Sequence, residues 1–377
     1  MITVFYAKAN SINPSYTILY DELSRRRESD LRVLDVSSLS EEEVGRYARA
    51  SDLVVVDNFV RAAPDLDPAG LHSVTLGNWR GAEFYARAWE IASTAGAPLL
   101  YVASGWDLHW PGPDLERLLP RLSAIAWLFE RRPVAREEVP PAYRDPWMEG
   151  HADPIENWEK VRSRVATRIE LIHTISPYEF RPAAARPLWD VCIAGATYRP
   201  RVLADASARE AGLAIAPFRR ADSAILRATA RLPFFIGNFY ASRLRNRVRQ
   251  ASQRLFTARS AINFVCGSGY RYPVRKFFEI PAVRSALLCY PCTGMRDYGF
   301  VAGEHYLEVA PEGFGREAKK LLAEPNRRER MIEKAAAMVR RLHSVGRRAS
   351  DLIECMRRMR AGRLRVARFH EGEFVIE

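Results

Sequence analysis

The stretch that decides the fold is Asp190–Arg201, which reads Asp-Val-Cys-Ile-Ala-Gly-Ala-Thr-Tyr-Arg-Pro-Arg. Its apolar beginning predicts a strand over Trp189–Ala194, and Gly195 predicts a tight turn before a helix over Val202–Ala211. A strand, a glycine turn and a helix in this order form the repeating unit of doubly wound parallel sheets. A proline-containing break at 181–188 precedes the unit, so the unit predicts the start of a second domain.

The same alternation of apolar and amphipathic runs continues on both sides of this stretch. The other expected strands are Ile2–Tyr6, Leu31–Val36, Leu53–Asp57, Leu99–Ala103, Ala124–Phe129, Leu171–Ile175, Leu213–Ala216, Ala261–Cys266, Ala286–Cys289 and Tyr306–Val309. The other expected helices are Ser15–Arg27, Glu83–Ala95, Val274–Ala282, Gly315–Ala323, Arg327–Arg341 and Arg347–Arg360. Near-continuous apolar strands separated by helices indicate parallel sheets covered on both faces. We therefore expect an α/β protein of two tandem doubly wound, Rossmann-like domains, 1–180 and 181–377, that face a cleft. The last helix is free to cross back to the N-terminal domain.

Length and composition set the broad class. The chain has 377 residues with 48% hydrophobic content, which is enough for two cores. No apolar run approaches the roughly 20 residues that span a bilayer, and the N-terminus lacks the pattern of a secretion signal. Five scattered cysteines favour a reducing compartment, so a cytoplasmic protein is expected. The net charge of +12 is consistent with binding to nucleic acid, to an anionic membrane or to a phosphate-rich ligand. The alternative is that a GC-rich genome encodes arginine in place of lysine.

A set of motifs between residues 261 and 356 points to a family. The motifs are Arg275-Lys276-Phe277-Phe278-Glu279-Ile280-Pro281-Ala282, Ser285-Ala286-Leu287-Leu288-Cys289, Gly303-Glu304-His305-Tyr306, Leu321-Leu322-Ala323-Glu324-Pro325 and His343-Ser344 followed by Arg348-Ala349. In order and spacing they resemble the C-terminal domain of GT-B glycosyltransferases of group 1, in particular the CgeB-like branch. Residues 190–201 resemble the strand and turn that open this domain. The resemblance implies a GT-B fold and transfer of a sugar from a nucleotide-sugar donor to a glycan, lipid-linked or protein acceptor, without an obligatory metal.

The donor site follows from the chemistry of a nucleotide sugar. A diphosphate needs cations or backbone amides at a helix start, and a ribose needs a carboxylate acceptor. The resemblance assigns the phosphates to Arg275 and the ribose to Glu279, which share one helix face. The alternative is a plain ion pair on a helix surface. The predicted nucleotide-sugar-binding residues are Gly195, Thr197, Tyr198, Arg199, Arg201, Tyr270, Arg275, Lys276 and Glu279.

One position departs from the family pattern. Many retaining relatives carry a glutamate eight positions before the residue that matches Glu279, and Arg271 stands there in this chain. The departure leaves the donor sugar and the choice between retention and inversion open. A degenerate transferase without activity is therefore one alternative, and an epimerase of the same architecture, acting on the free nucleotide sugar, is another.

The N-terminal domain offers candidates for the acceptor side. Asp107 and His109 follow the strand predicted at Leu99–Ala103, and either could act as the general base that deprotonates an acceptor hydroxyl. The alternative is a turn-capping aspartate and a packed histidine. Lys8 and Asn10 follow the first strand, where the same topological argument predicts contact with the acceptor.

A local excess of arginine lies in residues 218–259, interleaved with aromatic side chains. Such a segment suits a peripheral site on the anionic inner face of a membrane, or a core-facing aromatic stripe with a solvated arginine face. Nucleic acid is the less favoured partner, because no known binding module accompanies the charge. The pair Cys289 and Cys292 has no second such pair, so no metal site is predicted. A basic binding protein without enzymatic activity is the alternative outside the enzymes.

Overall fold

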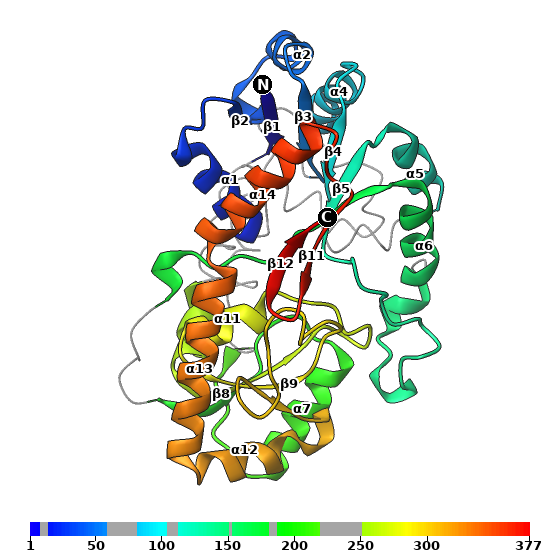
Figure 1. The fold of residues 1–377 in the computed structure, drawn as a ribbon. Helices are drawn as coiled ribbons and strands as arrows, with labels where there is room; N and C mark the ends of the chain where they lie inside the picture. Colours follow the sequence, from blue (N-terminus) through cyan, green and yellow to red (C-terminus); the bar gives the residue numbers. More distant parts are fainter. Residues whose placement is uncertain (8–13, 59–80, 104–111, 151–152, 181–186, 219–250) are drawn as a thin grey trace, which may run out of the picture.

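The computed structural model describes residues 1–7, 14–58, 81–103, 112–150, 153–180, 187–218 and 251–377, which form two sheets, one above the other (Figure 1). The larger sheet contains β1 (Ile2–Tyr6), β2 (Leu31–Asp35), β3 (Leu53–Asp57), β4 (Leu99–Val102), β5 (Ala124–Trp127), β6 (Thr167–Glu170), β11 (Val366–His370) and β12 (Glu373–Ile376). Their order is β12-β11-β6-β5-β4-β3-β1-β2, and only β12 runs antiparallel to its neighbour. The central strands are buried and apolar, as expected for a parallel sheet covered on both faces.

Helices cover both faces of the larger sheet. They are α1 (Pro14–Arg26), α2 (Glu41–Arg49), α4 (Gly81–Ser93), α5 (Gly112–Leu118) and α6 (Pro154–Arg164). Capping residues mark the N-termini of two of these helices. Ser40 and Glu43 form a capping box on α2, and the Asp153 carboxylate accepts from the Ile155 amide at the start of α6. Two hydrophobic clusters fill the two sides of this sheet.

The smaller sheet lies in the C-terminal half. It contains β7 (Trp189–Cys192), β8 (Ser260–Cys266), β9 (Ala286–Tyr290) and β10 (Leu307–Glu308), all parallel, in the order β10-β9-β8-β7. The helices around it are α7 (Arg199–Glu210), α11 (Lys276–Ala282), α12 (Phe314–Leu322) and α13 (Pro325–His343). The apolar faces of α7 and α12 and the first part of α13 join the strands in a separate core, whereas α11 packs in a cluster that continues into the larger sheet. The predicted α/β class with two doubly wound units is therefore confirmed.

The end of the chain returns to the larger sheet (Figure 1). Helix α14 (Val345–Arg360) lies against α1, and β11 pairs with β6. The Arg357 guanidinium fixes this return, since it donates to the carboxylates of Glu28 and Asp30 at 2.7–3.1 Å. The strands of residues 366–376 thus extend the N-terminal sheet, while the boundary at 180/181 stays a prediction.

Two expected strands differ in the structure. The strand predicted at Leu171–Ile175 is wrong, because β6 is Thr167–Glu170 and the apolar run after it pairs only at Ile175, with Ser344. β6 includes two charged residues, Arg168 and Glu170, whose charges are satisfied by distant partners, and an apolar run does not reveal such a strand. The strand expected at Leu213–Ala216 is reduced to one bridge between Val191 and Ile215. Among the described helices, none combines the length and the apolar character that crossing a membrane requires.

The crossing of α7 and α12 depends on one glycine. A Cβ atom at Gly315 would lie 2.1 Å from the Ser207 carbonyl oxygen and 2.9 Å from Ala211 Cβ. Gly315→Ala should therefore lower the free energy of unfolding by about 3 kcal/mol, because the two helices would be forced apart. Gly313→Ala is the control, since its Cβ would meet no atom closer than 3.5 Å. Equal denaturant midpoints for the two variants would contradict the close packing.

Candidate functional site

The candidate site lies beyond the carboxyl ends of β7 and β8, where open parallel sheets bind their ligands. Gly195 follows β7 with φ +113°, a conformation that favours glycine. A Cβ atom there would lie 2.6 Å from Arg201 Nη1 and 3.0 Å from Lys276 Cε. The structure therefore brings three of the predicted residues together, from the turn after β7, from α7 and from α11.

Arg201 is buried and holds the turn in shape. Its guanidinium donates to the carbonyl oxygens of Ala196 at 2.8 Å and Cys266 at 2.9 Å, and it lies 4.9 Å from the centre of the Tyr198 ring. Its contacts are with the turn itself and with the end of β8. The predicted contact of Arg201 with a donor phosphate stays a prediction.

Arg275 is the centre of a buried ionic cluster formed by Glu179, Gln253, Arg254, Arg275, Lys276 and Glu279, called here the Arg275 cluster. Its Nη2 donates to both carboxylate oxygens of Glu179 at 2.8 Å, and its Nη1 pairs with the Glu279 carboxylate. The same Nη2 donates to the Thr174 carbonyl oxygen at 3.3 Å. The plain surface pair that the spacing also allowed is thus replaced by a buried arrangement in which one guanidinium bridges two carboxylates.

Lys276 and Gln253 complete the surroundings of the Glu279 carboxylate. Lys276 Nζ lies 3.5 Å from Glu279 Oε2, and Gln253 Nε2 donates to the same oxygen at 3.3 Å. Burial raises the pKa of Glu279, but the charges of Arg275 and Lys276 outweigh it and bring the pKa down to about 2. Burial lowers the pKa of Lys276 to about 8, although Glu279 opposes this shift. Three cations, with Arg254 3.8 Å from Glu179, face two carboxylates, so the cluster is net positive at neutral pH.

His173 lies behind this cluster and remains neutral. Burial, helped by the charge of Arg275, lowers the pKa of His173 to about 3. Its ring centre lies 6.4 Å from that of Phe278 on α11. A buried neutral histidine adds no charge beside the cations, which suits a packing role at this position.

The other predicted donor residues surround the start of α7. Thr197 and the Arg199 side chain are exposed, while Tyr198 is half-buried. The backbone amide of Arg199 donates to Asp145 Oδ1 at 2.6 Å. Tyr270 is fully buried between β8 and α11, in a small cluster with Val139 and Met148.

Arg271, at the position of the missing glutamate, contacts the end of β9. Its Nε donates to the Pro291 carbonyl oxygen at 2.8 Å, and its guanidinium lies 5.2 Å from the centre of the Tyr290 ring. The residue has φ +58°, in the left-handed region. This arginine is thus part of the protein framework beside the candidate site.

Four predicted residues lie outside the described part of the chain: Lys8, Asn10, Asp107 and His109. The same is true of residues 219–250 of the basic segment. The proposed roles of these residues stay predictions.

Four residues of the site region were not predicted as site residues from the sequence: Asp145, Glu179, Gln253 and Arg254. Glu179 had a local signal, because Ser176 and Glu179 have capping-box spacing, and the Ser176 amide indeed donates to Glu179 Oε2 at 2.9 Å. Its partner Arg275 is 96 residues away, and no local pattern encodes such a pair. Asp145 reaches its partner across 54 residues in the same way.

Metal ligation has no evident place within the described residues. In that part of the chain no three His, Cys, Asp or Glu side chains gather as a metal site would require. Cys289 and Cys292 are buried free thiols, and burial raises the pKa of each. The prediction that no metal is obligatory remains a prediction.

The chain was compared with known proteins. Residues 219–354 match a family model described as glycosyl transferase-like, and this match includes α11, α12 and α13. None of the curated proteins matches the chain in sequence.

Solved structures share the fold along nearly the whole chain. HepE from Anabaena, in complex with UDP and glucose, is 9% identical with a TM-score of 0.51, and the match covers 94% of this chain and 98% of HepE. Sucrose-phosphate synthase from Thermosynechococcus elongatus is 10% identical with a TM-score of 0.52, and the match covers 96% of this chain and 99% of the synthase. The predicted GT-B fold is confirmed by these structures, and the match of residues 219–354 to a glycosyl transferase-like model agrees with the predicted activity.

Proposed function

We propose that this glycosyltransferase binds the diphosphate and ribose of its nucleotide-sugar donor at the Arg275 cluster and transfers the sugar to a glycan, lipid-linked or protein acceptor. The observation that carries the proposal is the net positive cluster, which includes the Glu279 carboxylate, at the carboxyl edge of the smaller sheet. HepE, with the same fold, is a structure in complex with UDP and glucose, which supports a nucleoside diphosphate as the ligand.

Each member of the cluster has a distinct part in the proposal. The N–H groups of Arg275 already donate to Glu179, Glu279 and the Thr174 carbonyl oxygen. In the proposal Arg275 therefore orients Glu279 and does not contact the ligand. Glu279 is ionised at neutral pH because its pKa is about 2, so its carboxylate would accept from the ribose hydroxyls. Lys276 Nζ lies 3.5 Å from the Glu279 carboxylate, and the side chain lies beside the Gly195 turn, so Lys276 is the cation of the described residues that is best placed for a phosphate.

The transfer itself needs charge stabilisation and a base. The bond from the sugar C1 to the donor phosphate breaks, and the nucleoside diphosphate leaves with increased negative charge. Lys276 would stabilise that charge directly, which is the basis for proposing no obligatory metal. An acceptor hydroxyl attacks C1, and Asp107 or His109 is the proposed base for its proton in an inverting reaction.

Nucleotide binding tests the site. In a panel of UDP, GDP, ADP, CMP and dTDP-sugars, with and without Mg²⁺, one nucleotide should raise the melting temperature by mass action, and without needing the metal. Glu279→Ala should weaken its binding at least about tenfold, since a charged hydrogen-bond acceptor is lost. Glu210→Ala, at the exposed far end of α7, is the control. Unchanged affinity in the Glu279 variant would remove the site from consideration.

The charge of Lys276 predicts a pH dependence. Its pKa of about 8 means that the side chain is protonated at pH 7 and loses its charge as the pH rises through 8. The affinity for UDP should therefore fall between pH 7 and pH 9, where the phosphates themselves no longer titrate. Lys276→Arg should flatten the profile, because a guanidinium stays charged over this range. A wild-type affinity independent of pH would show that Lys276 does not contact the phosphates.

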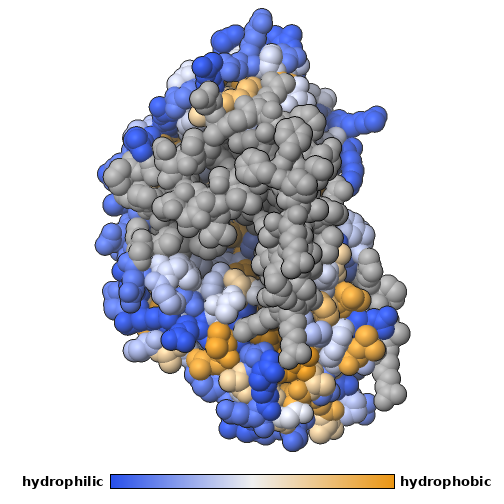
Figure 2. All heavy atoms as spheres, turned by 180° about the vertical axis from the view of Figure 1, so that it is seen from behind, coloured by the Kyte–Doolittle hydropathy of each residue, from blue (hydrophilic) through white to orange (hydrophobic). Residues whose placement is uncertain are grey.

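We further propose that the protein binds peripherally to an anionic membrane surface and acts in surface polysaccharide or glycoconjugate synthesis. Leu188 and Leu255 are 62% and 53% exposed, and Leu188 lies beside Arg259, to whose carbonyl oxygen its amide donates. Hydrophobic residues also occur among hydrophilic ones on the C-terminal half of the face in Figure 2. Exposed leucines beside arginines suit insertion between anionic headgroups.

Vesicle binding tests this placement. The protein should sediment with phosphatidylglycerol vesicles but not with phosphatidylcholine vesicles, and added salt should release it. Leu188→Ser with Leu255→Ser should weaken the binding, whereas Val301→Ser, at another exposed apolar position, should not. Equal binding to both lipids would contradict an electrostatic attachment.

A further inference from the structure

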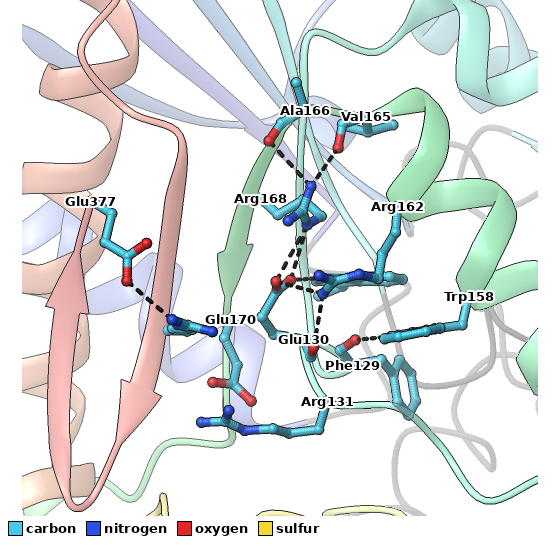
Figure 3. A network of polar contacts seen from close by, with 12 residues as sticks. Phe129, Glu130, Arg131, Trp158, Arg162, Val165, Ala166, Arg168, Glu170 and Glu377 are labelled. Carbon is cyan, nitrogen blue, oxygen red and sulfur yellow. Dashed lines mark hydrogen bonds and ion pairs between the residues drawn. The ribbon is translucent and has the colours of Figure 1, made fainter.

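A long connection of the N-terminal half lies across the candidate donor site. It joins β5 to α6, and we call its residues 130–149 the strap. Glu130 fixes its beginning, because this buried carboxylate accepts from Arg162 at 2.8 Å and from Arg168 at 3.2 Å (Figure 3). The Asp153 carboxylate, at the start of α6, accepts from the Arg136 amide at 3.0 Å. The first part of the strap is thus anchored to β6 and α6 in the N-terminal half.

The middle of the strap packs on the smaller sheet. Val139 and Met148 are buried against Tyr270, in the loop between β8 and α11. Tyr143 stacks edge-on against Tyr290 at the end of β9, and its hydroxyl donates to Glu312 Oε2 at 2.9 Å. The strap therefore covers the carboxyl ends of β8 and β9, the edge at which a nucleotide would enter.

Asp145 puts a negative charge at the start of α7. Its side chain is only 3% exposed, and its Oδ1 accepts from the Arg199 amide, the first residue of the helix. Burial raises the pKa of Asp145, although the Arg199 amide, the charges of Arg199 and Arg201 and a hydrogen bond with Trp147 oppose this shift. A helix N-terminus attracts anions through its free amides and its dipole, and here a carboxylate of the chain occupies that place.

We infer that the strap is an autoinhibitory element, in which Asp145 occupies the position of a donor phosphate at α7 and must leave when the nucleotide sugar binds. The inference rests on the proposed donor site at the Gly195 turn and deepens it by adding regulation. A carboxylate and a phosphate oxygen compete for the same backbone amides, so the two occupants exclude each other. Release of the strap also uncovers the loop that carries Tyr270.

Charge removal at Asp145 tests the competition. In calorimetric titrations of the full chain, Asp145→Asn should bind UDP about tenfold more tightly than the wild type, because a neutral amide competes less well for the helix amides. Glu149→Gln removes the same charge from an exposed position of the strap and is the matched control. If the wild type binds UDP and Asp145→Asn binds it with equal or lower affinity, the inference is overturned and the proposed donor site is unaffected.

A second variant displaces the strap without touching its charges. A Cβ atom at Gly269 would lie 2.5 Å from Val139 Cγ1 and 2.7 Å from the Tyr143 carbonyl oxygen, so Gly269→Ala forces the strap away. This variant should also bind UDP more tightly than the wild type. If neither variant nor the wild type binds UDP or any other nucleoside diphosphate, the proposed donor site itself is wrong and the inference falls with it.

Hydrogen exchange distinguishes a strap that competes with the nucleotide from a strap that closes over it. With saturating UDP, the amides of residues 130–149 should exchange faster than in the free wild-type protein, because the strap is released. Slower exchange would mean that the strap folds over the nucleotide, and would overturn the autoinhibitory role.

Discussion

The candidate site depends on one buried interaction, the placement of the Arg275 guanidinium between Glu179 and Glu279. Arg275 lies at the start of α11 in the C-terminal half, whereas Glu179 lies in the connection that leads out of the N-terminal half. A buried arginine needs its partners, because an unpaired charge in the interior costs several kcal/mol. The interaction therefore fixes the Glu279 carboxylate and joins the two halves of the chain at the same point.

Around this interaction the fold supplies a consistent electrostatic field. The start of α7, the buried Arg201 and the partly desolvated Lys276 all favour negative charge near the Gly195 turn. In the donor site that we propose, Glu279 provides the carboxylate that accepts from the ribose. The structure places the Asp145 carboxylate at the start of α7, in the same field, and the autoinhibitory role that we propose for it follows from this position.

Sequence alone predicted most of the architecture but not the long-range contacts. Apolar runs marked β1, β3 and β8 almost to the residue, because buried parallel strands contain few polar side chains. The strand predicted at Leu171–Ile175 was placed too late in the chain, because the true strand β6 contains the charged Arg168 and Glu170, whose partners are supplied by tertiary structure. The pair of Arg275 and Glu279 followed from helical spacing and family resemblance, but the contacts of Glu179 and Asp145 needed the folded chain.

The most direct test of the account is the crystal structure of the full chain with UDP, in the presence of a chelator. We predict that the diphosphate lies within hydrogen-bond distance of Lys276 Nζ and of the turn after β7, with the ribose hydroxyls on the Glu279 carboxylate and no metal between them. UDP bound at another edge of either sheet, with the Arg275 cluster unchanged, would contradict the assignment of the donor site.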